Sequence, residues 1–170
     1  DDAFYTPDLR TIIANSEEGQ TVIAIDIASH TVHWVAGEPN RIGVGPRHFN
    51  TPDDGVPAPD GTIYVADIRN CRIVHLSASG QYLGSMGNGA CYHDPPNSFG
   101  SPNGAFPTSN GNLVVTEIHG SWVDLLSHTG SLIWASQAPV SYPSDALAYP
   151  DGTVLLTDYT SSGKVIRMTS

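Results

Sequence analysis

Three stretches of the chain carry one pattern: TPDDGVPAPDGTIYVADI at residues 51–68, SPNGAFPTSNGNLVVTEI at 101–118 and YPSDALAYPDGTVLLTDY at 142–159. They align without a gap. In each stretch a proline precedes a turn glycine, and an acidic residue ends an apolar run: Pro52, Gly61 and Asp67; Pro102, Gly111 and Glu117; Pro143, Gly152 and Asp158. The pattern recurs after roughly 50 and then roughly 41 residues, the range of propeller blades.

The second half of each unit recurs as well. RIVHLSASGQYLGS at 72–85 parallels WVDLLSHTGSLIWA at 122–135, and TVIAIDIASHTVHWVA at 21–36 is a degenerate first copy. In the second copy this predicts strands at 55–58, 62–66, 72–77 and 81–85, joined by glycine turns. A β-sandwich also has short strands, but it does not explain the repeated spacing.

We therefore expect an all-β chain, a β-propeller segment with blades of four antiparallel strands. We expect about three and a half to four repeats, and the notion that they form part of a larger ring stays open. We expect one domain over residues 1–170, with repeats near 11–49, 50–99, 100–140 and 141–170.

The run PDGTIYVADIRNCRIVHLSASGQYLGSMG at 59–87 resembles an NHL repeat. It has the aspartate–glycine turn, the apolar strand ending in Ala-Asp, the short loop with asparagine and the Arg-Ile-Val strand of that family. Later copies depart from it, because Glu117 replaces the aspartate and Trp122 replaces the arginine. The resemblance implies a propeller but no single function, since NHL-like propellers include protein-binding modules, RNA binders and enzymes.

Composition excludes several classes of partner. The formal net charge is −10, and Lys164 is the only lysine. Nucleic acids and anionic lipid surfaces both require a basic patch, so neither is expected as a partner. No apolar run approaches the length of a membrane span. The start at Asp1, without Met or a signal-peptide pattern, is typical of a processed or excised segment.

The two cysteines are predicted to form a disulfide. Cys71 begins the third strand of its unit and Cys91 lies just beyond the fourth strand. These two strands form a hairpin, so both thiols lie at the same end of one blade. A disulfide indicates an oxidising, extracellular location, secreted or at the cell surface.

The loops that follow the second and fourth strands of each unit share one face of a propeller. Most histidines and many acids fall there, so we expect this face to bind a protein or carbohydrate ligand. The predicted binding residues are Asp53, Asp54, His93, Asp94, Asn103, His119 and Asp145. The chain has no HExxH, G-x-S-x-G or CxxC motif, so no catalytic residue is predicted and a binding or structural module is favoured.

Asp67, Glu117 and Asp158 end the second strand of three units. Because they recur in every such unit, we expect a structural role, in which each carboxylate accepts backbone N–H groups of a neighbouring loop.

Asp54, Asn103 and Asp145 are expected near the central channel, where oxygen ligands from successive blades suit Ca²⁺. TPDDG and SPNGAF also resemble the motifs by which gluconolactonase-type six-bladed propellers hold a catalytic divalent metal. That resemblance implies Asp53 and Asn103 as ligands. It fails at Ser144, which stands where the family has a carboxylate, and at the family's first-blade glutamate, which has no counterpart. The alternatives are a Ca²⁺-dependent lactonase or esterase and a channel lined by solvated polar groups.

The fourth unit ends at residue 168–170, where its last strand should begin. We expect the strand at 164–168 to be paired on its outer side by a second chain, by residues 3–6, or not at all. Pairing with a second chain would make an oligomer or an extracellular assembly by strand addition.

Overall fold

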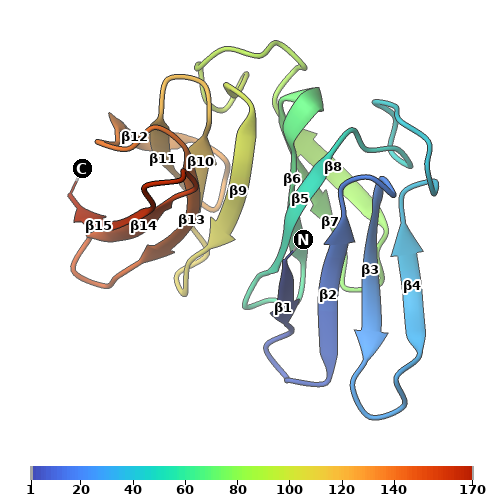
Figure 1. Ribbon diagram of the computed structural model, residues 1–170. Coiled ribbons are helices and arrows are strands. Elements are labelled where there is room, and N and C mark those ends of the chain that lie inside the picture. Colours follow the sequence, from blue (N-terminus) through green and yellow to red (C-terminus); the bar gives the residue numbers. More distant parts are fainter. Residues whose placement is uncertain (1, 170) are drawn as a thin grey trace.

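The structure is a computed structural model that describes residues 2–169, so Asp1 and Ser170 lie outside the described part. Four antiparallel sheets follow one another around a common axis, as Figure 1 shows. The all-β propeller fold predicted from the repeats is therefore confirmed. None of the described residues belongs to a helix that is long and apolar enough to cross a bilayer.

Each blade is a meander whose strands run outward from the axis in chain order. Blade 1 consists of β1 (Ala3–Tyr5), β2 (Thr11–Ser16), β3 (Thr21–Asp26) and β4 (Val32–Ala36). Blade 2 consists of β5 (Pro52–Pro57), β6 (Ile63–Asp67), β7 (Arg72–Leu76) and β8 (Tyr82–Met86), with the 3₁₀ turn η1 (Ile68–Asn70) between β6 and β7. Blade 3 consists of β9 (Pro102–Pro107), β10 (Leu113–Glu117), β11 (Trp122–Leu126) and β12 (Leu132–Gln137). Blade 4 has three strands, β13 (Pro143–Ala148), β14 (Val154–Asp158) and β15 (Lys164–Met168).

The N-terminal segment is the inner strand of blade 1, with Phe4 opposite Ile13. The expectation that residues 3–6 could supply the missing outer strand of blade 4 is therefore wrong. A hairpin with the adjacent β2 closes only a short loop, which costs less entropy than pairing across the whole chain. Among the described strands, β15 pairs with β14 alone, so its outer edge is open.

Three apolar clusters join successive blades. Alternating side chains of the second and third strands, rich in valine and isoleucine, supply most of each cluster, as half-buried strands do. The largest buried members are Phe49 between blades 1 and 2, Phe99 between blades 2 and 3, and Phe106 between blades 3 and 4. Because each blade packs mainly on its neighbours, the inner strands are held side by side around the axis.

The predicted disulfide between Cys71 and Cys91 is confirmed, with the two Cα atoms 5.2 Å apart. Cys71 is buried at the start of β7, and its left-handed backbone (φ 50°) ends the turn η1. Cys91 lies in the loop 87–101 that crosses from blade 2 to blade 3. The bond thus anchors this connecting loop to a rigid strand.

Replacing both cysteines, as Cys71→Ala with Cys91→Ala, is expected to lower the free energy of unfolding by about 3 kcal/mol, because the unfolded chain regains the entropy of an open loop. Urea unfolding measures this loss. A reductant should produce a similar loss in the wild-type chain and none in the double variant. Equal stability of the two proteins without reductant would contradict this expectation.

Candidate functional site

The candidate site is a pocket on the inner strands, at the end of the axis where the predicted binding face lies. Its volume is about 540 Å³. The residues that line it come from all four blades and are Asp2, Glu17, Asp53, Asn103, Tyr142, Ser144, Asp145 and Tyr159. These residues, together with the adjoining Asp54, are here called the inner acidic pocket. All eight lining side chains carry oxygen atoms, and four of the eight are acids.

A β-bulge in β5 positions the most deeply buried acid. The register with β6 shifts between Asp53 and Gly55, and the extra residue, Asp54, has a positive φ of 40°. A bulge of this kind turns a side chain out of the regular alternation of a strand. The neighbouring β9 makes room with Gly104, where an added Cβ would lie 2.9 Å from Oδ2 of Asp54.

Asp54 is 1% exposed, and no N–H or hydroxyl group in the described part of the chain donates to its carboxyl oxygens; its side-chain contact is with the carboxyl group of Asp2. Carboxylate oxygens of Asp2 and Asp145 lie close by, and one ligand atom from each of the three acids falls within 4.8 Å of the others. Burial, followed by the charges of Asp53 and Asp145, raises the pKa of Asp54 to about 9. A buried carboxyl group of this kind is neutralised either by a proton, as the raised pKa indicates, or by a cation that displaces the proton.

The surrounding groups are held by specific contacts. Burial, followed by the charge of Glu17, raises the pKa of Asp53 to about 6. The Asn103 side-chain NH₂ group donates to the Ser144 hydroxyl at 3.3 Å, so this bond does not use the amide oxygen of Asn103. The Thr157 hydroxyl donates to the Asp145 carboxylate at 3.2 Å. Asp53 lies on β5, Asn103 on β9, and Ser144 and Asp145 on β13, so the inner strands of blades 2, 3 and 4 position these four side chains.

Oxygen donors of this kind fit Ca²⁺, which takes six to eight carboxylate, carbonyl, amide and water oxygens. Asp54, Asp145 and Asp2 would supply the charged ligands, and Asn103 and Asp53 lie near enough to line the same space. These residues fit a Ca²⁺ ion, because the buried Asp54 carboxyl group receives no hydrogen bond from a described N–H or hydroxyl group.

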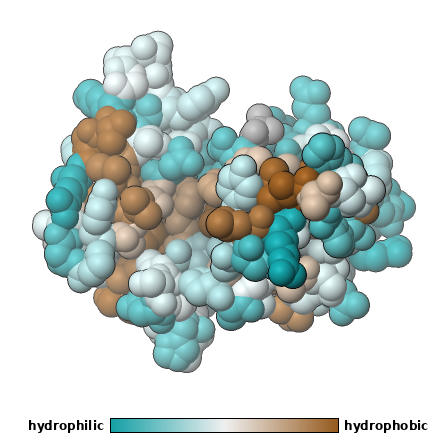
Figure 2. Space-filling view, turned by 90° about the horizontal axis from the view of Figure 1, so that it is seen from below, coloured by the Kyte–Doolittle hydropathy of each residue, from teal (hydrophilic) through white to brown (hydrophobic). Residues whose placement is uncertain are grey.

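The opposite end of the axis is apolar. A pocket of about 480 Å³ there is lined mainly by apolar side chains, including Phe4, Val56, Phe106 and Leu147, and Asp145 lines both this pocket and the inner acidic pocket. Figure 2 views the molecule from this end and shows hydrophobic surface surrounded by hydrophilic residues. The two ends of the axis therefore differ sharply in polarity.

The structure brings together four of the predicted binding residues, Asp53, Asp54, Asn103 and Asp145, in the inner acidic pocket. The other three lie elsewhere on the same face. Asp94 and His119 are exposed in loops, with Asp94 accepting from the Asn97 side chain and His119 3.4 Å from the Ser101 hydroxyl; His93 instead contacts blade 3.

The three acids that end the second strands each accept a backbone N–H from the loop that leads into the inner strand of the same blade. Asn50 donates to Asp67 at 2.7 Å, Gly100 donates to Glu117, and Tyr142 donates to Asp158 at 3.0 Å. Each contact joins a loop to the strand end beside it.

Asp67 also forms a buried ion pair that sequence reasoning missed. The Arg72 Nε donates to Asp67 Oδ2 at 2.7 Å, and both side chains are almost wholly buried. The remaining guanidinium N–H groups of Arg72 donate to backbone carbonyls of Val44, Gly45 and His48. Arg72 thus fastens the loop between blades 1 and 2 to blade 2.

Comparison with known proteins supports the fold and nothing finer. No family model and no curated protein matches the chain. Among solved structures, hydrazine synthase from Kuenenia stuttgartiensis superposes with a TM-score of 0.74 at 13% identity, covering 98% of this chain and 45% of that chain. Virginiamycin B lyase from Staphylococcus aureus superposes with a TM-score of 0.67 at 14% identity, covering 98% of this chain and 54% of that chain.

Both neighbours are β-propeller proteins, and this chain spans about half the length of each. At such low identity the likeness carries the architecture alone, because unrelated functions share one fold. The chain thus has a β-propeller fold with four blades.

Proposed function

We propose that this chain is a secreted binding module that holds Ca²⁺ in the inner acidic pocket and uses the site to bind a hydroxyl-rich ligand, a carbohydrate. The observation that carries the proposal is the carboxyl group of Asp54, which is buried, lies beside the carboxyl groups of Asp2 and Asp145, and receives no hydrogen bond from a described N–H or hydroxyl group. A divalent cation would compensate this charge.

The rest of the pocket suits such a ligand. Asp53 and Glu17 offer acceptors for sugar hydroxyl groups, since an ionised carboxylate only accepts hydrogen bonds. The rings of Tyr142 and Tyr159 lie edge to face, with centroids 5.5 Å apart, and offer an aromatic surface at the rim. The disulfide supports an extracellular location, where Ca²⁺ is abundant enough for modest affinity.

Calorimetric titration of the EDTA-treated chain with Ca²⁺ tests this proposal. We expect one Ca²⁺ site per chain, and we expect Asp54→Asn to weaken its affinity by at least about 10–100-fold, since even partners outside the ligand shell have effects of that size. Asp94→Asn removes an acid of the same face outside the pocket and should leave the affinity unchanged. Absence of binding, or equal affinity in the Asp54→Asn chain, would refute the proposal.

A Ca²⁺-dependent lactonase or esterase is the second candidate. The observation that favours it is that Asp53 and Asn103, the metal ligands implied by the gluconolactonase resemblance, line the same pocket. A hydrolase should open a lactone or cleave an aryl ester only with the cation present, and should lose that activity in Asn103→Ala. Calcium binding without hydrolysis would leave the binding module.

Assembly by strand addition is the third candidate, and it rests on the open outer edge of β15. Its Val165 is exposed, and unpaired N–H and C=O groups of an edge strand are a template for a second chain. Analytical ultracentrifugation should then detect dimers that a proline in place of Ile166 abolishes. A monomer at all concentrations would exclude this candidate.

A further inference from the structure

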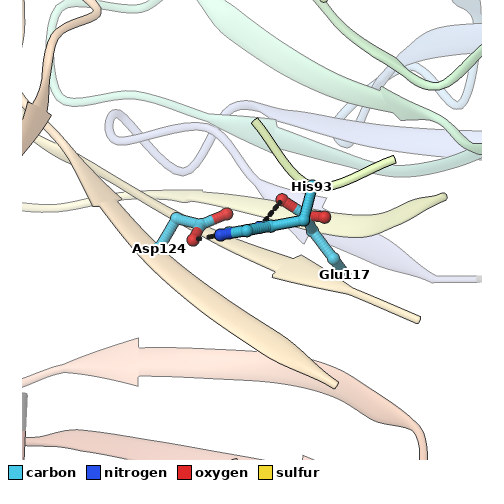
Figure 3. Close-up of side chains that lie close together, drawn as sticks. All are labelled: His93, Glu117 and Asp124. Atoms are coloured by element: carbon cyan, nitrogen blue, oxygen red, sulfur yellow. Dashed lines mark hydrogen bonds and ion pairs between the residues drawn. The ribbon is translucent and has the colours of Figure 1, made fainter. Parts of the chain in front are cut away.

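A second group of titratable side chains lies inside blade 3, away from the inner acidic pocket. Figure 3 shows Glu117 and Asp124 reaching from the neighbouring strands β10 and β11 toward the imidazole of His93. The Nδ1 atom of His93 lies 3.1 Å from Oε1 of Glu117 and 3.9 Å from Oδ1 of Asp124. His93 belongs to the loop 87–101, which the disulfide at Cys91 anchors.

Asp124 stands at a position where the other blades are apolar. The residues at the same register are Ile23 in blade 1, Val74 in blade 2 and Ile166 in blade 4. Asp124 is 0% exposed, and no N–H or hydroxyl group among residues 2–169 donates to its oxygens; its side-chain contacts are the ion pair with His93 and the neighbouring carboxyl group of Glu117. An acid in a core position without a donor destabilises a chain unless something compensates it.

Blade 2 shows how the fold otherwise compensates a strand-end acid. There Arg72 neutralises Asp67, whereas in blade 3 the residue at the position of Arg72 is Trp122. Trp122 instead stacks on the His93 ring, with centroids 3.9 Å apart and the planes 5° from parallel. Blade 3 thus buries two carboxyl groups and replaces the guanidinium with one imidazole.

We propose that His93, Glu117 and Asp124 bind one divalent transition-metal ion of the Zn²⁺ class, which fastens the loop 87–101 to blade 3. One ligand atom from each residue lies within 4.8 Å of the others. In a tetrahedral zinc site, bonds of about 2.0–2.2 Å place ligand atoms roughly 3.3–3.6 Å apart, and the two distances from His93 Nδ1 lie on either side of that range.

The donor set selects this class of metal over Ca²⁺. Imidazole nitrogen with carboxylate oxygen suits Zn²⁺ and its neighbours, whereas the inner acidic pocket offers oxygen alone. Trp122 fixes the orientation of the His93 ring, and Gly100 N–H binds the second oxygen of Glu117, which are the supporting contacts that metal ligands require. The His93 side chain is 20% exposed, which gives the ion a route of entry.

The test is equilibrium dialysis of the EDTA-treated chain against Zn²⁺, with Ca²⁺ in excess to occupy the inner acidic pocket. We expect one Zn²⁺ per chain, and at least a 100-fold loss of affinity in His93→Ala and in Asp124→Val. Asp124→Val copies Val74 of blade 2, so it should fold. The Co²⁺ form should show d–d absorption bands that both variants lose.

Matched controls are His128→Ala and Glu18→Gln, which remove an exposed histidine and an exposed acid outside both clusters and should bind Zn²⁺ as the wild type does. Asp54→Asn should also retain this site, so failure of the calcium proposal and failure of this one are separable. No stoichiometric Zn²⁺, or Zn²⁺ bound equally by the His93→Ala and Asp124→Val chains, would overturn the inference.

Discussion

Arg72→Met is expected to lower the free energy of unfolding by about 3–5 kcal/mol, because it leaves the buried carboxylate of Asp67 without its counter-ion. Three backbone carbonyls of the loop 44–48 lose their donors at the same time. Urea unfolding followed by tryptophan fluorescence measures the loss. Methionine fills much of the volume of the arginine stem, so the loss of stability should come from the missing charge and hydrogen bonds and not from a cavity.

The chain contains its own control for this effect. Arg167 pairs with Asp151 on the surface, where both side chains are about half exposed and water screens their charges, so Arg167→Met should lower the free energy of unfolding far less than Arg72→Met. Adding Asp67→Asn to Arg72→Met should recover part of the lost stability, because the uncompensated charge disappears. Equal losses in Arg72→Met and Arg167→Met would contradict the buried ion pair.

In EDTA, the stability of the wild-type chain is expected to fall as the pH rises from about 4 to about 9. The pKa of Asp54 is about 9 in the folded chain and about 4 when unfolded, so across this interval the folded state binds more protons than the unfolded state. Protons therefore stabilise the fold, and removing them destabilises it. At pH 7, Asp54→Asn should be more stable than the wild type by up to about 4 kcal/mol.

Calcium should reverse this order, because it stabilises only the chain that retains the Asp54 carboxylate. The Asp54→Asn chain keeps a weaker dependence in the same direction from Asp53, whose pKa is raised to about 6. Thermal unfolding of both proteins at pH 5 and pH 8, with EDTA and with Ca²⁺, measures the effects of pH, of the cation and of the substitution on stability. Parallel pH curves for the two proteins in EDTA would exclude a strongly perturbed Asp54.

The repeat spacing and the placement of the cysteines were enough to predict the architecture and the disulfide. Turn glycines and valine-rich strands are local signals, and each blade repeats them. The role of residues 3–5 was not predictable, because a three-residue strand carries almost no pattern. The position of this strand depends on Phe4, which packs against the apolar cluster of blades 3 and 4.

Site residues were harder to predict for a different reason. Asp54 and Asp145 could be placed near the axis from the repeat, but the contribution of Asp2 depends on how the N-terminal strand enters the channel. The position of Asp124 could have been noticed in the sequence, because aligning the third strands of the repeats places Asp124 at the position of Val74. A single acid at a repeated apolar position indicates that blade 3 differs from the other blades. The pairing of Asp67 with Arg72 needed the register of β6 and β7.

Anomalous diffraction from crystals grown with Ca²⁺ tests the proposed cation site most directly. We predict one peak in the inner acidic pocket, about 2.3–2.6 Å from a carboxylate oxygen of Asp54, with Asp145 and Asp2 among the other ligands. A map without density for an ion in the pocket, or a calcium ion bound elsewhere while Asp54 remains without a ligand, would contradict the account.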